Sequence, residues 1–332
     1  MMRIIQISDT HLSPGKAHFT DNWAPLARWI GEQSPDLVIH TGDVTVDGAD
    51  VTEDLRYAAE LMRGLGVRFR AVPGNHDVGD PRHSRQPVNG ERLQRWRAHF
   101  GPDRWVEDVE DCRLIGFDAM LLGSGEREEG LQADWLDGVM RAAADRRIAW
   151  FLHRPLFLDS PDESDTGYWS VKPQPRSWLV ERMQRHSVAL VASGHLHKAH
   201  DFVRNGTRYI WGPSSAFLVG PRLKAPPMAG EHRLGAVSTT SRRVRSRQGS
   251  HKSPVFRSVG SMTSLTRSTR TALTSELPLP SGPSTGRARA ASEDLQAALV
   301  VEIVLRRTGH AEALHDPARP LIGGNRHRDD LL

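Results

Sequence analysis

Five short motifs contain the residues of this chain whose types and spacing could do chemistry. They read Asp9-Thr10-His11, Gly42-Asp43, Gly74-Asn75-His76-Asp77, His153 and Gly194-His195-Leu196-His197. Together they supply three carboxylates, one amide and five imidazoles. Oxygen and imidazole ligands in that number fit two adjacent metal ions with a proton donor beside them. Any one motif arises by chance, but five in a single chain, each after a buried strand pattern, favour one metal centre.

The first three motifs offer distinct ligand types. Asp43 is the expected bridge between two ions, because a carboxylate can touch both and the preceding glycine allows a sharp turn. Asn75 offers a neutral oxygen, which keeps the site from becoming too negative for an anionic substrate. Asp9 and His11 are two residues apart, so both can reach one ion.

The histidines of the remaining motifs complete the expected centre. His195 and His197 share the same spacing and can serve different ions. His153 is a strand-end ligand, or else a turn residue. Asp77 either orients His76 or caps the turn that carries it. The histidines expected in the core, on the surface or behind the ligands are His40, His99, His186 and His200.

Alternating strand and helix patterns position these motifs. Apolar spacing predicts strand, helix, strand, helix, strand over residues 3–8, 23–33, 36–40, 52–65 and 67–72, with Thr52 capping the second helix. Helices are expected over 91–100, 131–144 and 176–186, and strands over 105–109, 112–118, 148–152, 188–192, 200–204 and 207–211. This order is typical of α/β proteins, whose sites lie at the carboxyl ends of parallel strands.

Composition divides the chain near residue 220. All nine Trp and all three Tyr lie at or before Trp211, so the core must form from roughly the first 220 residues. Residues 1–220 carry a net charge of −5 and residues 221–332 carry +9, against +4 for the whole chain. The basic charge therefore belongs to the tail, where a solvated disordered segment is favoured over a nucleic-acid arm.

We therefore predict a domain over residues 1–237 and a basic Ser/Thr/Arg-rich tail over 238–332 that is disordered, irregular or read in a shifted frame. Within the tail, residues 295–305 form an apolar island that could be a strand, a short helix or a partner-binding segment. The single cysteine, Cys112, excludes an internal disulfide and a cysteine-based zinc site. The chain shows neither a membrane span nor a signal-peptide pattern, so we expect a cytoplasmic protein.

The motif order resembles that of the calcineurin-like metallophosphoesterase superfamily, DxH, GD, GNH[DE], H and GHxH, over about residues 1–220. The run Ser8-Asp9-Thr10-His11-Leu12 is similar to the class III 3′,5′-cyclic-nucleotide phosphodiesterase branch. The resemblance implies a four-layer α/β/β/α sandwich with two metal ions. Mixed oxygen and nitrogen ligands suit Fe, Mn, Zn or Co, and the sequence does not choose among them. The implied ligands are Asp9, His11, Asp43 and His197 for the first ion, and Asp43, Asn75, His153 and His195 for the second.

The resemblance also implies a reaction. A metal-bridging hydroxide would attack a phosphodiester in line with its leaving group, as in phosphoric diester hydrolases, and cyclic nucleotides are the first expected substrates. His76 and Asp77 are the expected catalytic pair, and Asn75, His76 and Arg154 the expected substrate contacts. Arg154 stands where many members have a second histidine, and it either binds phosphate or is solvated.

Several alternatives stay open. The same chemistry would serve a phosphomonoesterase, a protein phosphatase, a nucleotide or lipid pyrophosphatase, or a nuclease, although the charge of −5 over residues 1–220 disfavours nucleic acid. A metal-binding scaffold without activity is a further alternative. Residues 157–173 are expected to overhang the site with an acidic cluster and with Tyr168 and Trp169, which either stack on a nucleobase or pack locally. The partner is expected to be a small phosphoester, with a homodimer left open.

Overall fold

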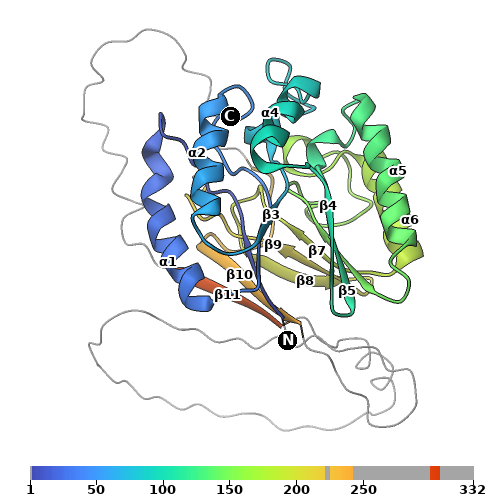
Figure 1. Ribbon diagram of the computed structural model, residues 1–332. Coiled ribbons are helices and arrows are strands. Elements are labelled where there is room, and N and C mark those ends of the chain that lie inside the picture. Colours follow the sequence, from blue (N-terminus) through green and yellow to red (C-terminus); the bar gives the residue numbers. More distant parts are fainter. Residues whose placement is uncertain (1, 221–224, 242–299, 307–332) are drawn as a thin grey trace, which may run out of the picture.

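Two β-sheets packed face to face form the middle of the molecule, and helices cover both outer faces (Figure 1). The computed structural model describes residues 2–220, 225–241 and 300–306. Helices α1 (Trp23–Gln33) and α2 (Thr52–Arg63) lie on one side, and α5 (Arg127–Arg141) and α6 (Pro173–His186) lie on the other. The predicted α/β class and four-layer sandwich are confirmed.

The first sheet joins the amino-terminal strands to two strands from later in the chain. In spatial order its strands are β11 (Val300–Arg306), β10 (Leu234–Ser241), β1 (Met2–Ile7), β2 (Leu37–His40) and β3 (Phe69–Ala71). Strands β1, β2 and β3 are parallel, β10 is antiparallel to β1, and β11 is antiparallel to β10. The parallel strands therefore end at one edge, as their helical connections require.

The second sheet has six strands with a parallel centre. In spatial order they are β4 (Trp105–Val109), β5 (Cys112–Gly116), β6 (Arg147–Phe151), β7 (Val188–Ser193), β9 (Thr207–Trp211) and β8 (His200–Arg204). Strands β5, β6, β7 and β9 are parallel, while β4 and β8 form antiparallel edges. The carboxyl ends of β6 and β7 are the ones that carry histidine motifs.

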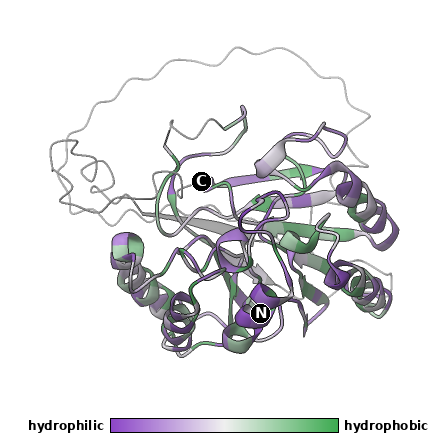
Figure 2. Cartoon of the chain, turned by 90° about the horizontal axis from the view of Figure 1, so that it is seen from above, coloured by the Kyte–Doolittle hydropathy of each residue, from purple (hydrophilic) through white to green (hydrophobic). Residues whose placement is uncertain are grey.

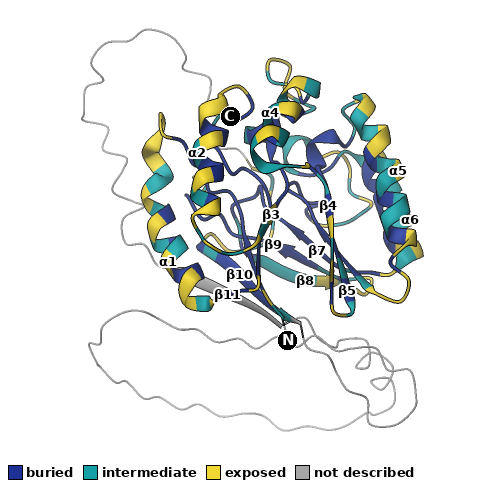
Figure 3. Cartoon of the chain, viewed as in Figure 1, coloured by how far each residue is buried: buried dark blue, intermediate teal, exposed yellow. Residues whose placement is uncertain are grey.

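Alternation along the strands builds the core on both faces of each sheet. Ile4 joins the buried cluster between the sheets together with Phe151 and Ala192, whereas its neighbour Ile5 belongs to the cluster that includes Ile30 of α1. Figure 3 shows most strand residues buried and the outward helix faces exposed. Figure 2 shows the same helices with hydrophilic residues facing outward, so burial of their apolar faces holds the layers together.

Shorter elements lie in the connections. They are α3 (Asn75–Val78), α4 (Gly90–Phe100), and the 3₁₀ helices η1 (Ala17–Asn22), η2 (Ala119–Leu121) and η3 (Gly167–Trp169). Among the described residues, no helix has the length and apolar character needed to cross a membrane.

Two strands come from the region around and beyond the predicted domain boundary at 237. Strand β10 runs on to Ser241, and β11 falls within the apolar island of residues 295–305 and just beyond it. The two pair in register, with Val237 opposite Ile303. The island is therefore a strand. The rest of the predicted tail, residues 242–299 and 307–332, lies outside the described residues.

Candidate metal centre

The five motifs meet at the edge where the parallel strands of both sheets end. Asp9 and His11 follow β1, Asp43 follows β2, His153 follows β6, and His195 and His197 follow β7. Hydrogen bonds join these loops directly: Asp9 N donates to the carbonyl of Gly42 at 3.0 Å within the first sheet, and His195 N donates to Asp9 Oδ2 at 3.1 Å between the two sheets. The two sheets therefore deliver their side chains to one place.

Backbone strain collects at this edge. Positive φ angles occur at Asp9, His11, Asp43, His195 and His197, five of the ten non-glycine residues with this conformation in the described chain. A non-glycine residue in this region costs roughly 1–3 kcal/mol and persists only where the surroundings hold it. The strain turns side chains that follow a strand inward toward a common point.

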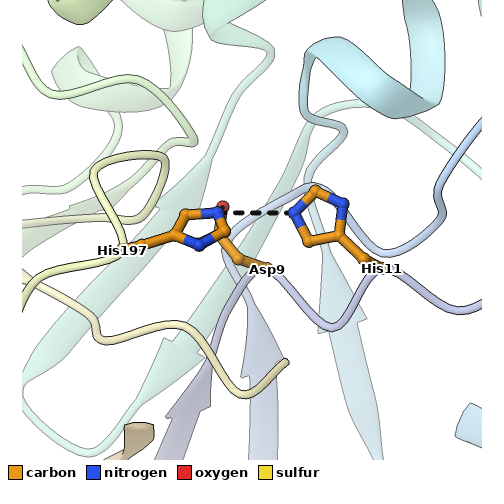
Figure 4. Close-up of side chains that lie close together, drawn as sticks. All are labelled: Asp9, His11 and His197. Carbon is orange, nitrogen blue, oxygen red and sulfur yellow. Dashed lines mark hydrogen bonds and ion pairs between the residues drawn. The ribbon is translucent and has the colours of Figure 1, made fainter. Parts of the chain in front are cut away.

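Asp9, His11 and His197 form the first cluster of ligand atoms, and Figure 4 shows them pointing toward one another. His197 Nε2 lies 3.3 Å from Asp9 Oδ1 and 3.4 Å from His11 Nε2. One ligand atom from each lies within 4.8 Å of the others, and all three residues are buried. This is the spacing of groups that could share one cation.

Asp43, His153 and His195 form the second cluster, with ligand atoms again within 4.8 Å of one another. His153 Nε2 lies 3.3 Å from Asp43 Oδ2 and 3.2 Å from His195 Nδ1. Asp43 Oδ2 also lies 3.9 Å from His11 Nε2 of the first cluster. Asp43 therefore stands between the two clusters, as a bridging carboxylate must.

Backbone carbonyls hold the histidine rings of the centre. Four of the rings place one nitrogen on a carbonyl, and that nitrogen carries a proton because a carbonyl oxygen only accepts. The bonds are His153 Nδ1 to Thr41 O at 2.8 Å, His197 Nδ1 to Phe217 O at 3.0 Å, His195 Nε2 to Tyr168 O at 2.9 Å, and His76 Nδ1 to Val46 O at 2.7 Å. In His153, His195 and His197, the remaining nitrogen is the one that faces the cluster.

The electrostatics of the centre favour bound positive charge. Burial alone would raise the pKa of the Asp43 carboxyl, but nearby His153 and other histidines hold it well below its usual value. Burial opposes protonation of His153, yet Asp43 raises its pKa to about 9. Burial, with neighbouring histidines, lowers the pKa of His11 and of His195 well below the usual value. A cation at these atoms would take the place of the proton on His153.

The side-chain oxygen of Asn75 is an unsatisfied hydrogen-bond acceptor. Its Oδ1 is buried and has no hydrogen-bond partner among the described residues, and the side chain is 8% exposed. Its Nδ2 donates to the Tyr168 hydroxyl at 3.3 Å. An unsatisfied buried acceptor is costly. An orphaned amide oxygen, together with the imidazoles and carboxylates of the two clusters, fits residues that hold a divalent cation.

Asp77 caps the turn and does not orient the ring of His76. Its carboxylate accepts hydrogen bonds from Val44 N at 3.1 Å, Thr45 N at 2.9 Å, Thr45 Oγ1 at 2.6 Å and Gly74 N at 2.9 Å. It thereby ties the Asp43 loop to the turn that carries Asn75. Of the two roles considered for Asp77, this is turn capping, because His76 bonds to Val46 instead.

Arg154 is buried and not solvated, which corrects one of its two expected roles. The side chain is 2% exposed and forms an ion pair with Asp80, which is also buried. Its guanidinium carbon lies 5.6 Å from the ring centre of Tyr168, and its Nε has no hydrogen-bond partner among the described residues. Arg154 therefore belongs to the interior wall of the centre.

The carboxylates of residues 157–173 form ion pairs or face solvent and do not concentrate negative charge at the metal centre. Glu163 pairs with buried Arg176 at 3.3 Å, and Asp165 forms a two-pronged pair with Arg82 at 2.7 and 3.0 Å. Asp159 is 94% exposed. The negative charges are thus either compensated or directed to solvent.

Three aromatic neighbours of the centre were not identified as such from the sequence. Phe19 and Phe217 stack with ring centres 4.3 Å apart, and Phe217 lies 4.4 Å from the ring of His197. Tyr168, for which base stacking and local packing were the two expectations, lies 4.5 Å from the ring of His195. No local motif marks Phe19 or Phe217, since their position depends on loops from opposite ends of the domain.

His40 supports the centre from behind. Its Nδ1 accepts from Gly42 N at 3.2 Å and its Nε2 bonds to Thr10 Oγ1 at 2.9 Å. Burial lowers its pKa to about 3, so the ring stays neutral. It braces the turn that presents Asp43.

A model of the calcineurin-like phosphoesterase family matches residues 2–199 of this chain. The chain belongs to this family. The resemblance noted from the motifs is therefore confirmed at the level of the superfamily, whose members are metal-dependent phosphoester hydrolases.

Individual relatives carry several names. The chain is 29% identical over 217 residues, 59% of its length and 72% of the relative's, to "Probable glycerophosphodiester phosphodiesterase GpdQ" of Arcobacter nitrofigilis. It is 28% identical over 229 residues, 65% of its length and 81% of the relative's, to a "Probable cyclic nucleotide phosphodiesterase" of Synechococcus. It is 30% identical over 180 residues to serine/threonine-protein phosphatase CPPED1 of Danio rerio, where the match covers 50% of this chain and 55% of the relative.

Solved structures share the fold at low sequence identity. GAP50, the anchor in the inner membrane complex of Plasmodium, superposes with a TM-score of 0.51 at 14% identity, covering 72% of this chain and 80% of that one. A purple acid phosphatase from yellow lupin gives a TM-score of 0.50 at 16% identity, covering 72% and 49%. These likenesses concern the fold alone.

Proposed function

We propose that this chain hydrolyses phosphodiesters with the help of two metal ions, and that 3′,5′-cyclic nucleotides are the first substrates to test. The observation that carries the proposal is the place of Asp43, within reach of His11 of one cluster and His153 of the other. A carboxylate between two groups of ligands is what a pair of adjacent ions requires.

The proposed first ion position consists of Asp9, His11, Asp43 and His197. The second consists of Asp43, Asn75, His153 and His195. When bound, such ions lower the pKa of a water molecule and offset the charge of the phosphoryl oxygens. Imidazole with carboxylate and amide oxygen suits Mn, Fe, Zn or Co.

His76 is the proposed proton donor to the leaving oxygen. Its Nδ1 is held by Val46 at 2.7 Å, so its Nε2 is the nitrogen left for the substrate. It is only partly buried, whereas the surrounding ligands are buried, so it can meet a group that enters from solvent. Its ring lies 4.8 Å from that of His11, beside the first cluster. Asp77 contributes by holding the turn, and not by touching the substrate.

Two features support a small anionic substrate. Arg154 brings a guanidinium to the inner wall of the centre, and Asn75 adds an amide beside His76. Two relatives are named as probable phosphodiesterases, and their names support diester chemistry. The phosphatase relative favours a second candidate, hydrolysis of phosphomonoesters at the same centre. We extend the proposal to a cytoplasmic location. The single cysteine, Cys112, is a buried free thiol, which is compatible with a reducing compartment.

A substrate panel tests this proposal. Metal-stripped protein reloaded with Mn²⁺ is given bis(p-nitrophenyl) phosphate, p-nitrophenyl phosphate and 3′,5′-cyclic AMP, with Asn75→Ala as the control. Cleavage of the diester and of cyclic AMP, lost in the variant, is the expected result. Cleavage of the monoester alone would replace the proposal by the phosphatase candidate. No cleavage by protein that binds Mn²⁺ would favour the scaffold alternative.

A further inference from the structure

The short helix η3 brings Tyr168 against two residues of the second cluster. The Tyr168 hydroxyl accepts a hydrogen bond from Asn75 Nδ2 at 3.3 Å. Its backbone carbonyl accepts one from His195 Nε2 at 2.9 Å, and its ring centre lies 4.5 Å from that of His195. Tyr168 therefore contacts both Asn75 and His195.

That segment is itself held firmly. Glu163 accepts hydrogen bonds from Leu158 N at 2.9 Å and Asp159 N at 2.8 Å, and it pairs with buried Arg176 at 3.3 Å. Ion pairs across the connection join Asp165 to Arg82. A tyrosine carried by such a segment keeps a fixed position, because moving it would break several charge-assisted bonds at once.

A fixed hydroxyl matters for Asn75 because an amide has two different ends. If the side chain turned over, NH₂ would occupy the place of Oδ1, and an amide nitrogen has no free lone pair with which to bind a cation. With Nδ2 on the Tyr168 hydroxyl, Oδ1 is left as the orphaned buried acceptor. In this arrangement Oδ1 is the end of the Asn75 amide that stays available to a cation.

We propose that Tyr168 is a positioning residue for the second ion position: its hydroxyl holds the amide of Asn75 with the oxygen toward the cation, and its carbonyl fixes the tautomer of His195. This rests on the proposed two-ion function and adds a residue outside the five motifs. Partners that orient metal ligands are worth roughly 10–100-fold in metal affinity.

Manganese titration of the metal-stripped full chain, followed by calorimetry, tests the proposal without relying on activity. Tyr168→Phe removes only the hydroxyl. We expect one of the two Mn²⁺ affinities to fall by about 10-fold, while the other affinity and the unfolding temperature of the metal-free protein stay unchanged. Tyr57→Phe, which removes a hydroxyl from α2, is the matched control and should bind both ions as the parent does.

The same substitution in a chain that already carries a change at Asn75 distinguishes a positioning role of Tyr168 from a general loss of structure. In a chain that carries Asn75→Asp, both side-chain ends are oxygens, so the orientation of the group no longer matters. Adding Tyr168→Phe there should cost less than half a log unit of affinity, and the difference from the 10-fold loss in the parent chain measures the coupling between the two positions. Equal losses in both backgrounds, or unchanged Mn²⁺ binding in Tyr168→Phe alone, would overturn the proposal.

The test also distinguishes this failure from failure of the proposed function. If Asn75→Ala weakens one Mn²⁺ affinity and Tyr168→Phe does not, only the role of Tyr168 is lost. If Asn75→Ala leaves both affinities unchanged, the second ion position itself is wrong, and the role of Tyr168 is lost with it.

Discussion

Gly42→Ala should damage the centre from a position that bears no ligand. Gly42 has φ of +93°, and a Cβ placed there would lie 2.6 Å from His153 Nδ1 and 2.8 Å from Gly74 N. Ordinary contacts of a Cβ are 3.4–4 Å. The new methyl group would therefore strain the backbone and also push the His153 ring away from Asp43.

A second glycine separates the two contributions to the lost free energy of unfolding, backbone strain and overpacking. Gly66 also has a positive φ, +66°, but a Cβ there would meet nothing within 4 Å. Left-handed strain costs about 1–2 kcal/mol per residue, so Gly66→Ala should lose roughly that much. Overpacking adds about 1–3 kcal/mol, so Gly42→Ala should lose about 2–5 kcal/mol.

Urea unfolding of the metal-free variants measures both losses, and Mn²⁺ titration measures the effect on the centre. Gly42→Ala should bind the second ion at least 10-fold more weakly because the His153 ring moves, whereas Gly66→Ala should bind both ions normally. If the two variants lose equal stability and bind Mn²⁺ equally well, the close approach of the Gly42 turn to His153 is wrong.

Three further changes test other parts of the structure. His76→Ala should lower turnover by about 10²–10⁴-fold with metal content unchanged, and a parallel loss of metal would show that His76 is a ligand instead. Arg154→Ala leaves Asp80 buried without its partner and should cost about 3–5 kcal/mol in thermal unfolding, against less than about 1 for the surface pair lost in Arg204→Ala. Burial, then nearby negative charge, raises the pKa of Asp118 well above 3.8, so the folded chain holds a proton that the unfolded chain releases. The contribution of Asp118 to stability should therefore fall as the pH rises above about 4, so that Asp118→Asn gains stability relative to wild type between pH 4 and 8; parallel unfolding profiles of the two proteins would refute this.

The sequence predicts the layered elements well because their apolar spacing is local. The helix over 23–33 and the strands over 200–204 and 207–211 match the structure at both ends. The helix begins at Thr52, the residue predicted to cap it, and the capping residue is instead Val51, whose carbonyl accepts a hydrogen bond from Asp54 N at 3.2 Å. A backbone carbonyl thus takes the place of the expected side-chain acceptor.

Other features depend on distant parts of the chain and leave little local signal. Strand β10 is rich in Ser and Thr, and it forms because it pairs with β1 along its backbone. Arg154 pairs with Asp80, and Asn75 bonds to Tyr168. In each case the two partners come from different connections of the chain. The motifs indicate which residues gather at the centre, but not which residues hold them there.

The most direct test of the central claim counts Mn²⁺ ions per chain and measures bis(p-nitrophenyl) phosphate hydrolysis on the same samples of wild type and Asp43→Ala. The account predicts two ions and hydrolysis in the wild type, with fewer ions and no hydrolysis once the shared carboxylate is removed. Hydrolysis at the wild-type rate in Asp43→Ala, or in metal-stripped protein, would contradict it.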